Sequence, residues 1–396
     1  MTRTYDVAVL GLGAMGSAAA YQLSECEGLS VLGIDRFRPP HAMGSTHGDT
    51  RATRSAPFEG EELVPLARRS IEIYSGELQE ASGRRLFNQC GGLLIGRPGE
   101  PGYHHVENPF KSTVDAAERY GIPYELLSPA EVSRRHPNIR MLEDEQAYLE
   151  PSSGFLYAEE CVTAHLELAS SNGATLRYDE PVLAYEPRDS AVRVTTDRAT
   201  YEVGVLIISA GPWVKHLLPE LASLFELQRL ALYWFEVEDD DLYDAYTSMP
   251  RVGWAFGTGT YAFPAIDGPR GGVKVASEEF SVITSPETID RRIGPEDVRR
   301  MFDNNVQGRL LGLGPSVVRA ATCIYTMTPD SKFIIDRHPE HRNVIVASPC
   351  SGHGFKYSAA IGEALAQLAT RGTTALDIGA FRMNRFPEVI SGGNGC

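Results

Sequence analysis

The chain has 396 residues, and its 37 Lys and Arg against 52 Asp and Glu give a formal net charge of −15. Apolar residues make up 42% and charged residues 22%, which is ordinary for globular proteins and excludes disordered, collagen-like and coiled-coil chains. The acidic balance disfavours nucleic acid or an anionic membrane as a partner, and without an apolar run of about 18 residues we expect a soluble protein of two or three domains.

The N-terminal segment predicts a strand, a helix and a second strand. Tyr5–Leu10 and Ser30–Ile34 are short apolar runs, and the helix formers of Ala14–Leu23 lie between them. A crossover of about 30 residues implies two parallel strands in a buried sheet.

A glycine pattern, Gly11-x-Gly13-x-x-Gly16, follows the first strand directly and opens the helix. The first glycine permits a tight turn, the second lets the backbone approach a pyrophosphate, and the third lets helix and strand pack closely. Asp35 ends the second strand, where a carboxylate binds a ribose hydroxyl. The pattern predicts dinucleotide binding but does not separate FAD from NAD. Neighbouring residues with the same predicted role are Ala14, Met15 and Arg36.

Later segments predict further strands of the same sheet. Tyr201–Ser209 is stopped by the Ala-Gly-Pro of residues 210–212, and Asn343–Ala347 is fully apolar. The glycine-rich turn Ser351–Gly354 then leads into a predicted helix, Tyr357–Thr370. Leu230–Val237 instead alternates like a strand of an antiparallel sheet.

We interpret the fold as α/β with α+β character, in which a Rossmann-like nucleotide-binding domain is interleaved with a smaller antiparallel-sheet domain. The first domain is assigned to residues 1–85, 151–221 and 321–396. The second is assigned to residues 86–150 and 222–320.

The cysteines and the chain ends indicate the compartment. The apolar run within Met1–Val9 carries Asp6 and gives way to glycines, unlike a signal peptide. Cysteine is the last residue, whereas prenylation needs three residues after it. Scattered single cysteines favour free thiols in a reducing cytoplasm. They are Cys26, Cys90, Cys161, Cys323, Cys350 and Cys396.

Three longer motifs indicate a family. They are Gly44–Arg54 (GSTHGDTRATR), Cys323–Asp330 (CIYTMTPD) followed by Phe333–Asp336 (FIID), and Ser351–Lys356 (SGHGFK). With the glycine pattern, they resemble the monomeric sarcosine oxidase family, which includes N-methyltryptophan oxidase. The resemblance spans almost the whole chain. It implies a FAD-binding domain of the glutathione-reductase type interleaved with a smaller catalytic domain, in a monomer.

The resemblance implies that FAD is attached covalently, through its 8-methyl group, to Cys323. Attack by a thiolate is helped by nearby positive charge, which the resemblance assigns to Arg51 and His47. The alternatives are that Cys323 is a buried apolar residue and that Arg51 pairs with Asp49 or Glu59. Further flavin contacts are implied for Ser45, Thr46, Val182, Gly211, Gly352, Gly354, Phe355 and Lys356.

The resemblance also implies the reaction. Family members remove a hydride from the carbon beside a secondary amine to the flavin, the imine is hydrolysed, and dioxygen is reduced to hydrogen peroxide. The substrate carboxylate is held by residues that match Arg54 and Lys356, and Lys274 matches the lysine that activates dioxygen. The alternatives are that Lys356 extends from a helix start to solvent and that Lys274 lies on an exposed strand face.

One position departs from the family pattern. Sarcosine oxidases carry an active-site histidine four residues after the lysine that activates dioxygen, where this chain has Glu278. Because a carboxylate attracts an amine and repels an acid, we expect a substrate larger or more cationic than sarcosine. Tyr261 and Tyr325 match tyrosines that line the family's pocket, although a tyrosine in a sheet is often only core.

Other classes of protein remain as alternatives. A flavin-dependent dehydrogenase would pass electrons to another acceptor, a non-catalytic flavoprotein would serve as a redox module, and a nicotinamide-dependent dehydrogenase would be colourless. No metal is expected, since His338-x-x-His341 has no clustered acids or cysteines. No serine hydrolase is expected either, because Gly-x-Ser-x-Gly is absent.

Overall fold

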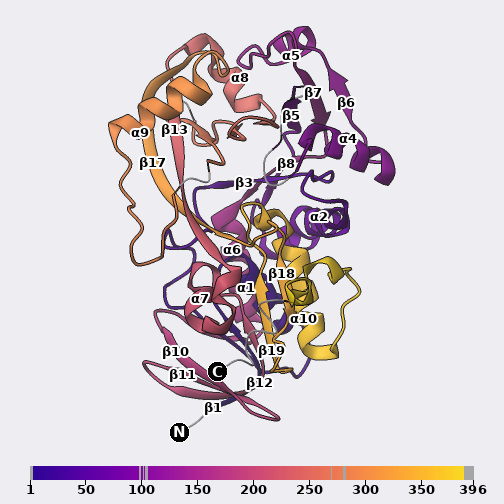
Figure 1. Ribbon diagram of the computed structural model, residues 1–396, viewed down its shortest axis with the longest axis vertical. Coiled ribbons are helices and arrows are strands. Elements are labelled where there is room, and N and C mark those ends of the chain that lie inside the picture. The colour runs from indigo at the N-terminus through magenta and orange to yellow at the C-terminus, as the bar shows by residue number, and fades with distance from the viewer. Residues whose placement is uncertain are drawn as a thin grey trace.

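The computed structural model describes residues 3–97, 100, 102, 106–268, 270–279 and 282–387, so that Cys396 lies outside the described residues. Its strands form two eight-stranded sheets and one three-stranded sheet. The first sheet occupies the lower half of Figure 1, the second occupies the upper half, and the small sheet lies between them.

The elements have the following bounds. The first sheet consists of β1 (Arg3–Leu10), β2 (Val31–Ile34), β9 (Thr175–Arg177), β10 (Val182–Pro187), β11 (Val192–Thr196), β12 (Thr200–Ile208), β18 (Ile334–Arg337) and β19 (Val344–Ser348). The second consists of β5 (Gly92–Gly96), β6 (Glu125–Leu127), β7 (Gln146–Glu150), β13 (Glu226–Val237), β14 (Arg251–Trp254), β15 (Tyr261–Ala262), β16 (Val273–Ala276) and β17 (Leu313–Met327). The small sheet consists of β3 (Thr50–Thr53), β4 (Phe87–Asn88) and β8 (Gly154–Tyr157). The helices are α1 (Ala14–Ser24), α2 (Val64–Glu72), α3 (Leu78–Ser82), α4 (Pro109–Tyr120), α5 (Pro129–Arg135), α6 (Ala158–Ser171), α7 (Val214–Leu217), α8 (Tyr243–Ser248), α9 (Pro295–Met301) and α10 (Ser358–Arg371).

The first sheet confirms the predicted strand–helix–strand unit. β1 lies between β2 and β12 and is parallel to both, and β19 continues the parallel pairing beyond β12. Val7 and Val9 of β1 belong to the apolar cluster on one face, while Ala8 and Leu10 belong to the cluster on the other. Burial on both faces explains why Val7–Leu10 is apolar at every position.

Helices α1, α6 and α10 pack together beside this sheet (Figure 1). A Cβ on Gly362 of α10 would lie 2.5 Å from the Cβ of Ala18, so only glycine permits this approach to α1. The predicted C-terminal helix is confirmed as a 3₁₀ turn, Gly354–Tyr357, followed by α10. It ends at Gly372, whose φ of +79° suits glycine at a helix C-terminus.

The second sheet is mainly antiparallel, as predicted, in the order β17–β13–β16–β15–β14–β5–β7–β6. The exception is β14, which pairs with β5 in parallel. The domain boundary that the sequence predicts between residues 320 and 321 falls inside β17, whose ladder with β13 continues from Met327 to Leu313. This boundary, like the others, stays a prediction.

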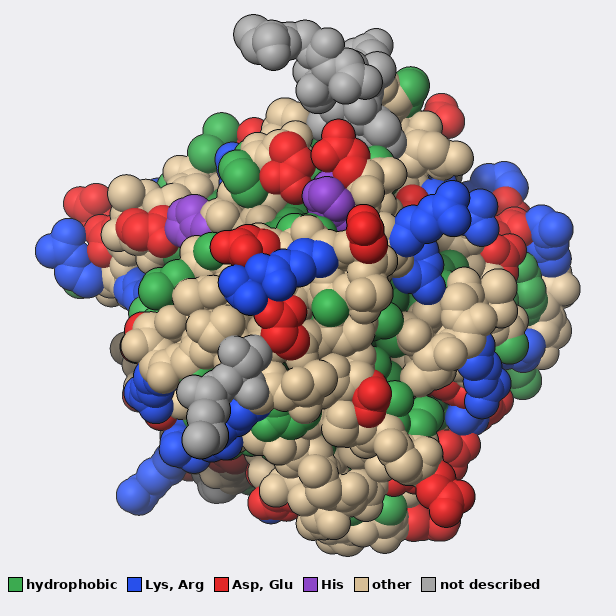
Figure 2. Space-filling view, turned by 90° about the horizontal axis from the view of Figure 1, so that it is seen from below, with side chains coloured by type: hydrophobic (Ala, Val, Ile, Leu, Met, Phe, Trp, Pro, Cys, Tyr) green, Lys and Arg blue, Asp and Glu red, His purple; other side chains and the backbone are tan. Residues whose placement is uncertain are grey.

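Acidic and basic side chains are interspersed on the face shown in Figure 2. The described cysteines are all free thiols. Among the helices of the described residues, none is long and apolar enough to cross a membrane.

Candidate active site

A cavity of about 420 Å³ receives residues from both large sheets. It begins at the turn between β1 and α1 and reaches the strands β14, β15 and β16 of the second sheet. Residues predicted for the cofactor that line it are Gly11, Gly13, Ala14, Met15, Asp35, Arg36, Ser45, Thr46, Arg51, Val182, Gly211, Gly352, Gly354, Phe355 and Lys356. Residues predicted for catalysis that line it are Arg54, Tyr261, Lys274, Glu278, Tyr325 and Lys356. Gly16, His47 and Cys323 do not belong to its lining.

At the end of the cavity next to β1, the chain makes a turn that requires glycine. Gly11 has a φ of +84°, which is unfavourable for residues with a side chain. A Cβ on Gly16 would lie 1.7 Å from the carbonyl oxygen of Gly11, so α1 packs directly on the turn. Gly16 therefore allows α1 to pack on the turn and does not line the cavity.

Asp35 completes this end. Its Oδ2 accepts a hydrogen bond of 2.7 Å from the backbone N–H of Leu12, and its Oδ1 accepts one of 2.8 Å from Phe37. A carboxylate can accept about four hydrogen bonds, so lone pairs remain for a ribose hydroxyl. The first residues of α1 also leave backbone N–H groups directed at the cavity end. The residues present therefore fit a dinucleotide.

Two cations share one buried carboxylate in the cavity wall. The Nη2 atom of Arg54 lies 2.7 Å from Oε1 of Glu59, and Nζ of Lys356 lies 2.9 Å from the same oxygen. These side chains are 10%, 4% and 5% exposed, so Lys356 does not reach bulk solvent. Two positive charges against one negative charge leave this cluster able to bind another carboxylate.

The cluster shifts the pKa values of its members. Burial alone would raise the pKa of the Glu59 carboxyl, but Arg54 and Lys356 outweigh it and hold that pKa well below its usual value. Burial lowers the pKa of Lys356 to about 8, against the opposing attraction of Glu59. Lys356 thus keeps its charge at neutral pH and loses it as the pH rises through about 8.

A second buried carboxylate fixes the segment that carries Arg54. Glu150 at the end of β7 is 1% exposed. Its oxygens accept hydrogen bonds of 2.7 Å and 3.2 Å from the backbone N–H groups of Ser55 and Ala56. The hydroxyl of Ser153 donates to the carbonyl of Thr53 at 2.7 Å. Neither Glu150 nor Glu59 belongs to a periodic or glycine-marked pattern, so their roles are not predictable from the sequence.

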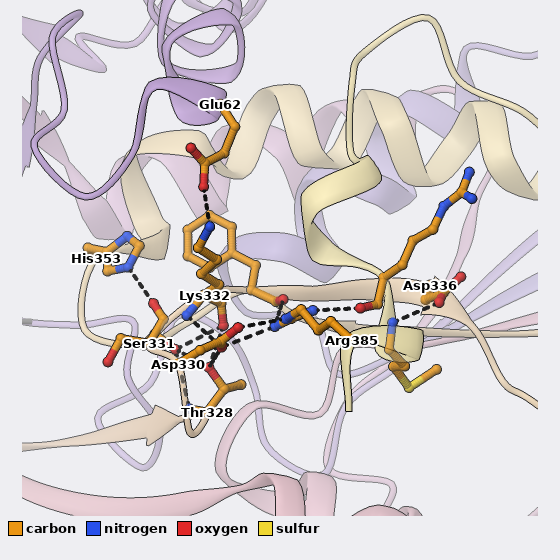
Figure 3. Close-up of polar contacts among 12 residues, drawn as sticks. Glu62, Thr328, Asp330, Ser331, Lys332, Asp336, His353 and Arg385 are labelled. Carbon is orange, nitrogen blue, oxygen red and sulfur yellow. Dashed lines mark hydrogen bonds and ion pairs between the residues drawn. The ribbon is translucent and has the colours of Figure 1, made fainter. Parts of the chain in front are cut away.

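Another network fixes the segment that carries Lys356 (Figure 3). In the turn after β17, Asp330 pairs with Arg385 at 2.7 Å. The carbonyl of Ser331 lies 3.0 Å from Nε2 of His353, and Lys332 pairs with Glu62 at 2.7 Å. The turn therefore connects the end of β17 with the loop before Lys356.

Lys274 of β16 is buried, which excludes the exposed strand face that the sequence left open. Its side chain is 3% exposed, and its Nζ donates to the carbonyls of Gly48 at 2.6 Å and Thr50 at 2.8 Å. The ring centroids of Phe263 and Trp234 lie 4.9 Å and 5.6 Å from Nζ. Burial, with repulsion from Arg51, holds the pKa of Lys274 well below its usual value.

The loop that faces Lys274 has an unusual backbone. Asp49 adopts a φ of +67°, and its Oδ2 accepts a hydrogen bond of 3.0 Å from Nε1 of Trp234 and pairs with Arg319. The carboxylate of Glu159 accepts from the backbone N–H of Gly48 at 2.7 Å. These contacts aim two backbone carbonyls at the Lys274 ammonium.

Cys323 is 1% exposed and packs with Leu232, Trp234 and Ala276. Its Sγ lies 3.7 Å from the carbonyl oxygen of Ser45, which lines the cavity. Burial raises the pKa of the Cys323 thiol, although nearby Arg51 opposes the change. The thiol therefore sits one residue layer from the cavity and is mainly protonated at neutral pH.

The expectation that His47 adds positive charge is wrong. Burial first, then repulsion by Arg51 and Lys274, lowers the pKa of His47 to about 3, so that the ring is neutral at pH 7. Arg51 does not pair with Asp49 or Glu59. Its Nη2 donates to the carbonyls of Ser45 and His47 at 2.7 Å and 2.6 Å, and its Nη1 donates to Thr50 at 2.8 Å.

Glu278, which follows β16, lines the cavity together with Tyr261 of β15 and Tyr325 of β17. The backbone N–H of Glu278 donates to the carbonyl of Thr258 at 2.8 Å. Burial, together with the charge of Glu278, raises the pKa of Tyr261 and that of Tyr325 well above 10. Both phenols are therefore neutral hydroxyl groups at physiological pH.

Nearly the whole chain is similar to known FAD-dependent proteins. Residues 6–368 match the family model for FAD dependent oxidoreductases. The monomeric sarcosine oxidase of Streptomyces avermitilis is 40% identical over 388 residues, which cover 97% of this chain and 98% of that protein. The N-methyl-L-tryptophan oxidase of Yersinia pestis is 33% identical over 386 residues, covering 96% and 99%.

Two solved structures share the fold. NikD, an amino acid oxidase of nikkomycin biosynthesis, superposes with a TM-score of 0.82 at 23% identity, covering 96% of this chain and 98% of NikD. The L-proline dehydrogenase of P. horikoshii superposes with a TM-score of 0.81 at 22% identity, covering 98% and 99%. These similarities confirm the predicted fold class.

Because Glu59 compensates two buried cations, its replacement should destabilise the fold. Glu59→Gln leaves Arg54 and Lys356 as adjacent buried cations and should lower the free energy of unfolding by about 3 to 5 kcal/mol. Chemical unfolding of the flavin-containing protein measures this. Added acetate should stabilise the variant more than the parent, because its carboxylate can replace that of Glu59.

Glu62→Gln is the matched control. Glu62 and its partner Lys332 are 29% and 43% exposed, so the change should cost less than about 1 kcal/mol. Equal losses in the two variants, or an equal effect of acetate on the variant and the parent, would contradict the interpretation.

Proposed function

The chain belongs to the FAD dependent oxidoreductase family, with the monomeric sarcosine and N-methyltryptophan oxidases as relatives, and from this premise we propose that it oxidises the C–N bond of a secondary-amine amino acid. The substrate is N-methylated or cyclic, the imine product is hydrolysed, and dioxygen is the electron acceptor. FAD, when bound, accepts a hydride equivalent from the substrate and passes the electrons to dioxygen. The enzyme acts as a cytoplasmic monomer.

The cluster of Arg54, Glu59 and Lys356 carries this proposal. An amino acid carboxylate that leaves water needs charge-assisted hydrogen bonds to offset its desolvation. Arg54 and Lys356 offer them from two elements of the wall, which fixes the orientation of the substrate as well as its position. Because both cations already contact Glu59, the substrate carboxylate competes with a built-in one, and its binding repositions these side chains.

Glu278 and the phenols of Tyr261 and Tyr325 serve the amine end of the substrate. A carboxylate beside neutral hydroxyl groups favours an ammonium or a further cationic group and disfavours a second acid close to it. This supports a substrate that is larger or more cationic than sarcosine.

Lys274 supports dioxygen as the acceptor. Its ammonium is fixed by two carbonyls and enclosed by two aromatic rings, so that it is preorganised for negative charge that develops on dioxygen. Arg51 adds a second positive charge nearby.

Cys323 is the proposed attachment point of FAD, through a thioether to the 8-methyl carbon. The C–S bond would replace the S–H bond of Cys323 and one C–H bond of the methyl group, and dioxygen would take the two hydrogens as hydrogen peroxide. Its family motif, and the short distance from its Sγ to the cavity-lining residue Ser45, support this assignment. Cys350 lines the cavity as well and is the matched alternative.

The function is tested by turnover of purified holoenzyme against a panel of N-methyl, cyclic and primary amino acids. We expect secondary amines to be oxidised, with one hydrogen peroxide formed for each dioxygen consumed. Oxidation only in the presence of an artificial acceptor would instead establish a dehydrogenase. Glu278→Gln should change the order of preference within the panel, and an unchanged order would remove its proposed role.

Covalent attachment is tested by acid precipitation followed by absorption spectra of pellet and supernatant. We expect flavin in the pellet for the parent and for Cys350→Ser, and in the supernatant for Cys323→Ser. Soluble flavin in the parent would overturn the attachment, and release by Cys350→Ser would move it to the other thiol.

The role of Lys274 is tested by stopped-flow reoxidation of the reduced enzyme. Lys274→Met should slow the reaction with dioxygen by about 100-fold or more and affect anaerobic reduction by substrate less. In the parent, reoxidation should slow as the pH rises through the pKa of Lys274, because the ammonium loses its charge there. Lys111→Met, whose side chain is 68% exposed, is the control, and equal effects of the two changes would refute the role.

A further inference from the structure

A third cation lines the cavity beyond Arg54 and Lys356. Arg251 begins β14, and its side chain is only 5% exposed. Strand alternation puts Arg251 and Gly253 on the same side of the sheet, and both line the cavity together with Leu94 of the neighbouring strand. Gly253 leaves space in front of this side of the sheet.

No acidic side chain of the described residues forms an ion pair with Arg251. Its Nε and Nη2 atoms both donate to the hydroxyl oxygen of Ser153, at 3.3 Å and 3.1 Å. A hydroxyl carries no charge, and a guanidinium has five N–H donors. A buried guanidinium held in this way remains incompletely compensated.

The carboxylates of Glu150 and Glu59, which attract Arg251 electrostatically, are hydrogen-bonded to other groups. Glu150 accepts from the backbone N–H groups of Ser55 and Ala56 and from the hydroxyl of Tyr148. Glu59 accepts from Arg54 and Lys356. Neither can turn to Arg251 without giving up these hydrogen bonds.

Arg251 keeps its positive charge at neutral pH. Burial, followed by repulsion from Arg54, lowers its pKa to about 10, which is still far above 7. Arg54 and Arg251 both line this one cavity, so its wall holds two sites that favour anions.

We propose that Arg251 is a second anion subsite and that the substrates are short dicarboxylic amino acids with a secondary amine, such as N-methylated acidic amino acids. This inference rests on the proposed function. Arg54 and Lys356 bind the α-carboxylate, Arg251 binds the side-chain carboxylate, and Glu278 faces the amine. The substrate is then larger than sarcosine, and its second charge is negative.

The test compares kcat/KM of the holoenzyme for N-methylaspartate and N-methylglutamate with that for N-methylnorvaline. We expect the parent to prefer the acidic substrates. Arg251→Gln should reduce this preference at least tenfold, and Arg251→Lys should restore part of it. Arg292→Gln, at a side chain that is 92% exposed, should leave the preference as it is.

The Ser153→Ala variant tests whether Arg251 binds the second carboxylate of the substrate or only positions the segment that carries Arg54. It removes the hydroxyl between Arg251 and the carbonyl of Thr53 and keeps the guanidinium, so we expect the preference for acidic substrates to persist. If Ser153→Ala and Arg251→Gln lower kcat/KM for all substrates alike, Arg251 only positions the segment that carries Arg54, and the subsite is refuted.

A binding measurement keeps the two proposals distinguishable. Succinate and glutarate should perturb the flavin absorbance at lower concentrations than butyrate, and Arg251→Gln should abolish the difference. Oxidation of N-methylnorvaline without any acidic preference, or a preference for N-methyllysine, would overturn the subsite and leave the function standing. If no N-alkyl amino acid is oxidised, the proposed function is overturned. The comparison of succinate with butyrate would then still test the subsite.

Discussion

The site depends on the compensation of charge among side chains buried in the wall of the cavity. Glu59 holds Arg54 from its own segment and Lys356, which is 297 residues away, because an anion lowers the cost of burying an ammonium and a guanidinium side by side. Glu150 fixes the backbone beside Arg54, and the turn after β17 fixes the loop before Lys356. One shared carboxylate thus joins segments from both ends of the chain into one wall, and this wall is poised to exchange it for the carboxylate of a substrate.

The two large sheets contribute different chemistry to the same cavity. The first supplies the glycine turn, the helix N-terminus and Asp35, which fit a dinucleotide. The second supplies Lys274, Arg251 and Tyr261, each from a different strand of one face. These strands are hydrogen-bonded neighbours in one sheet. Their side chains are therefore held at fixed separations, as preorganised electrostatics requires.

Local sequence patterns predicted the parts of the molecule that depend on local geometry. The glycine turn, the parallel strands and the helix that ends at Gly372 are recognisable because each imposes its own residue pattern. Arg251 and Glu150 are isolated charges in strands, and only tertiary packing decides that they are buried. The neutral state of His47 depends likewise on its burial and then on cations that the fold brings near it, and the length of β17 depends on its partner β13.

The central claim is that the carboxylate of the substrate is what the Arg54–Lys356 pair binds. The most direct measurement is the rate of anaerobic flavin reduction by an N-methyl amino acid and by its carboxamide, which keeps the amine and the reacting C–H bond. Loss of two charge-assisted contacts of about 1.5 kcal/mol each predicts that the carboxamide reacts about 100-fold more slowly at limiting concentration. Equal rates for the two compounds would contradict the account.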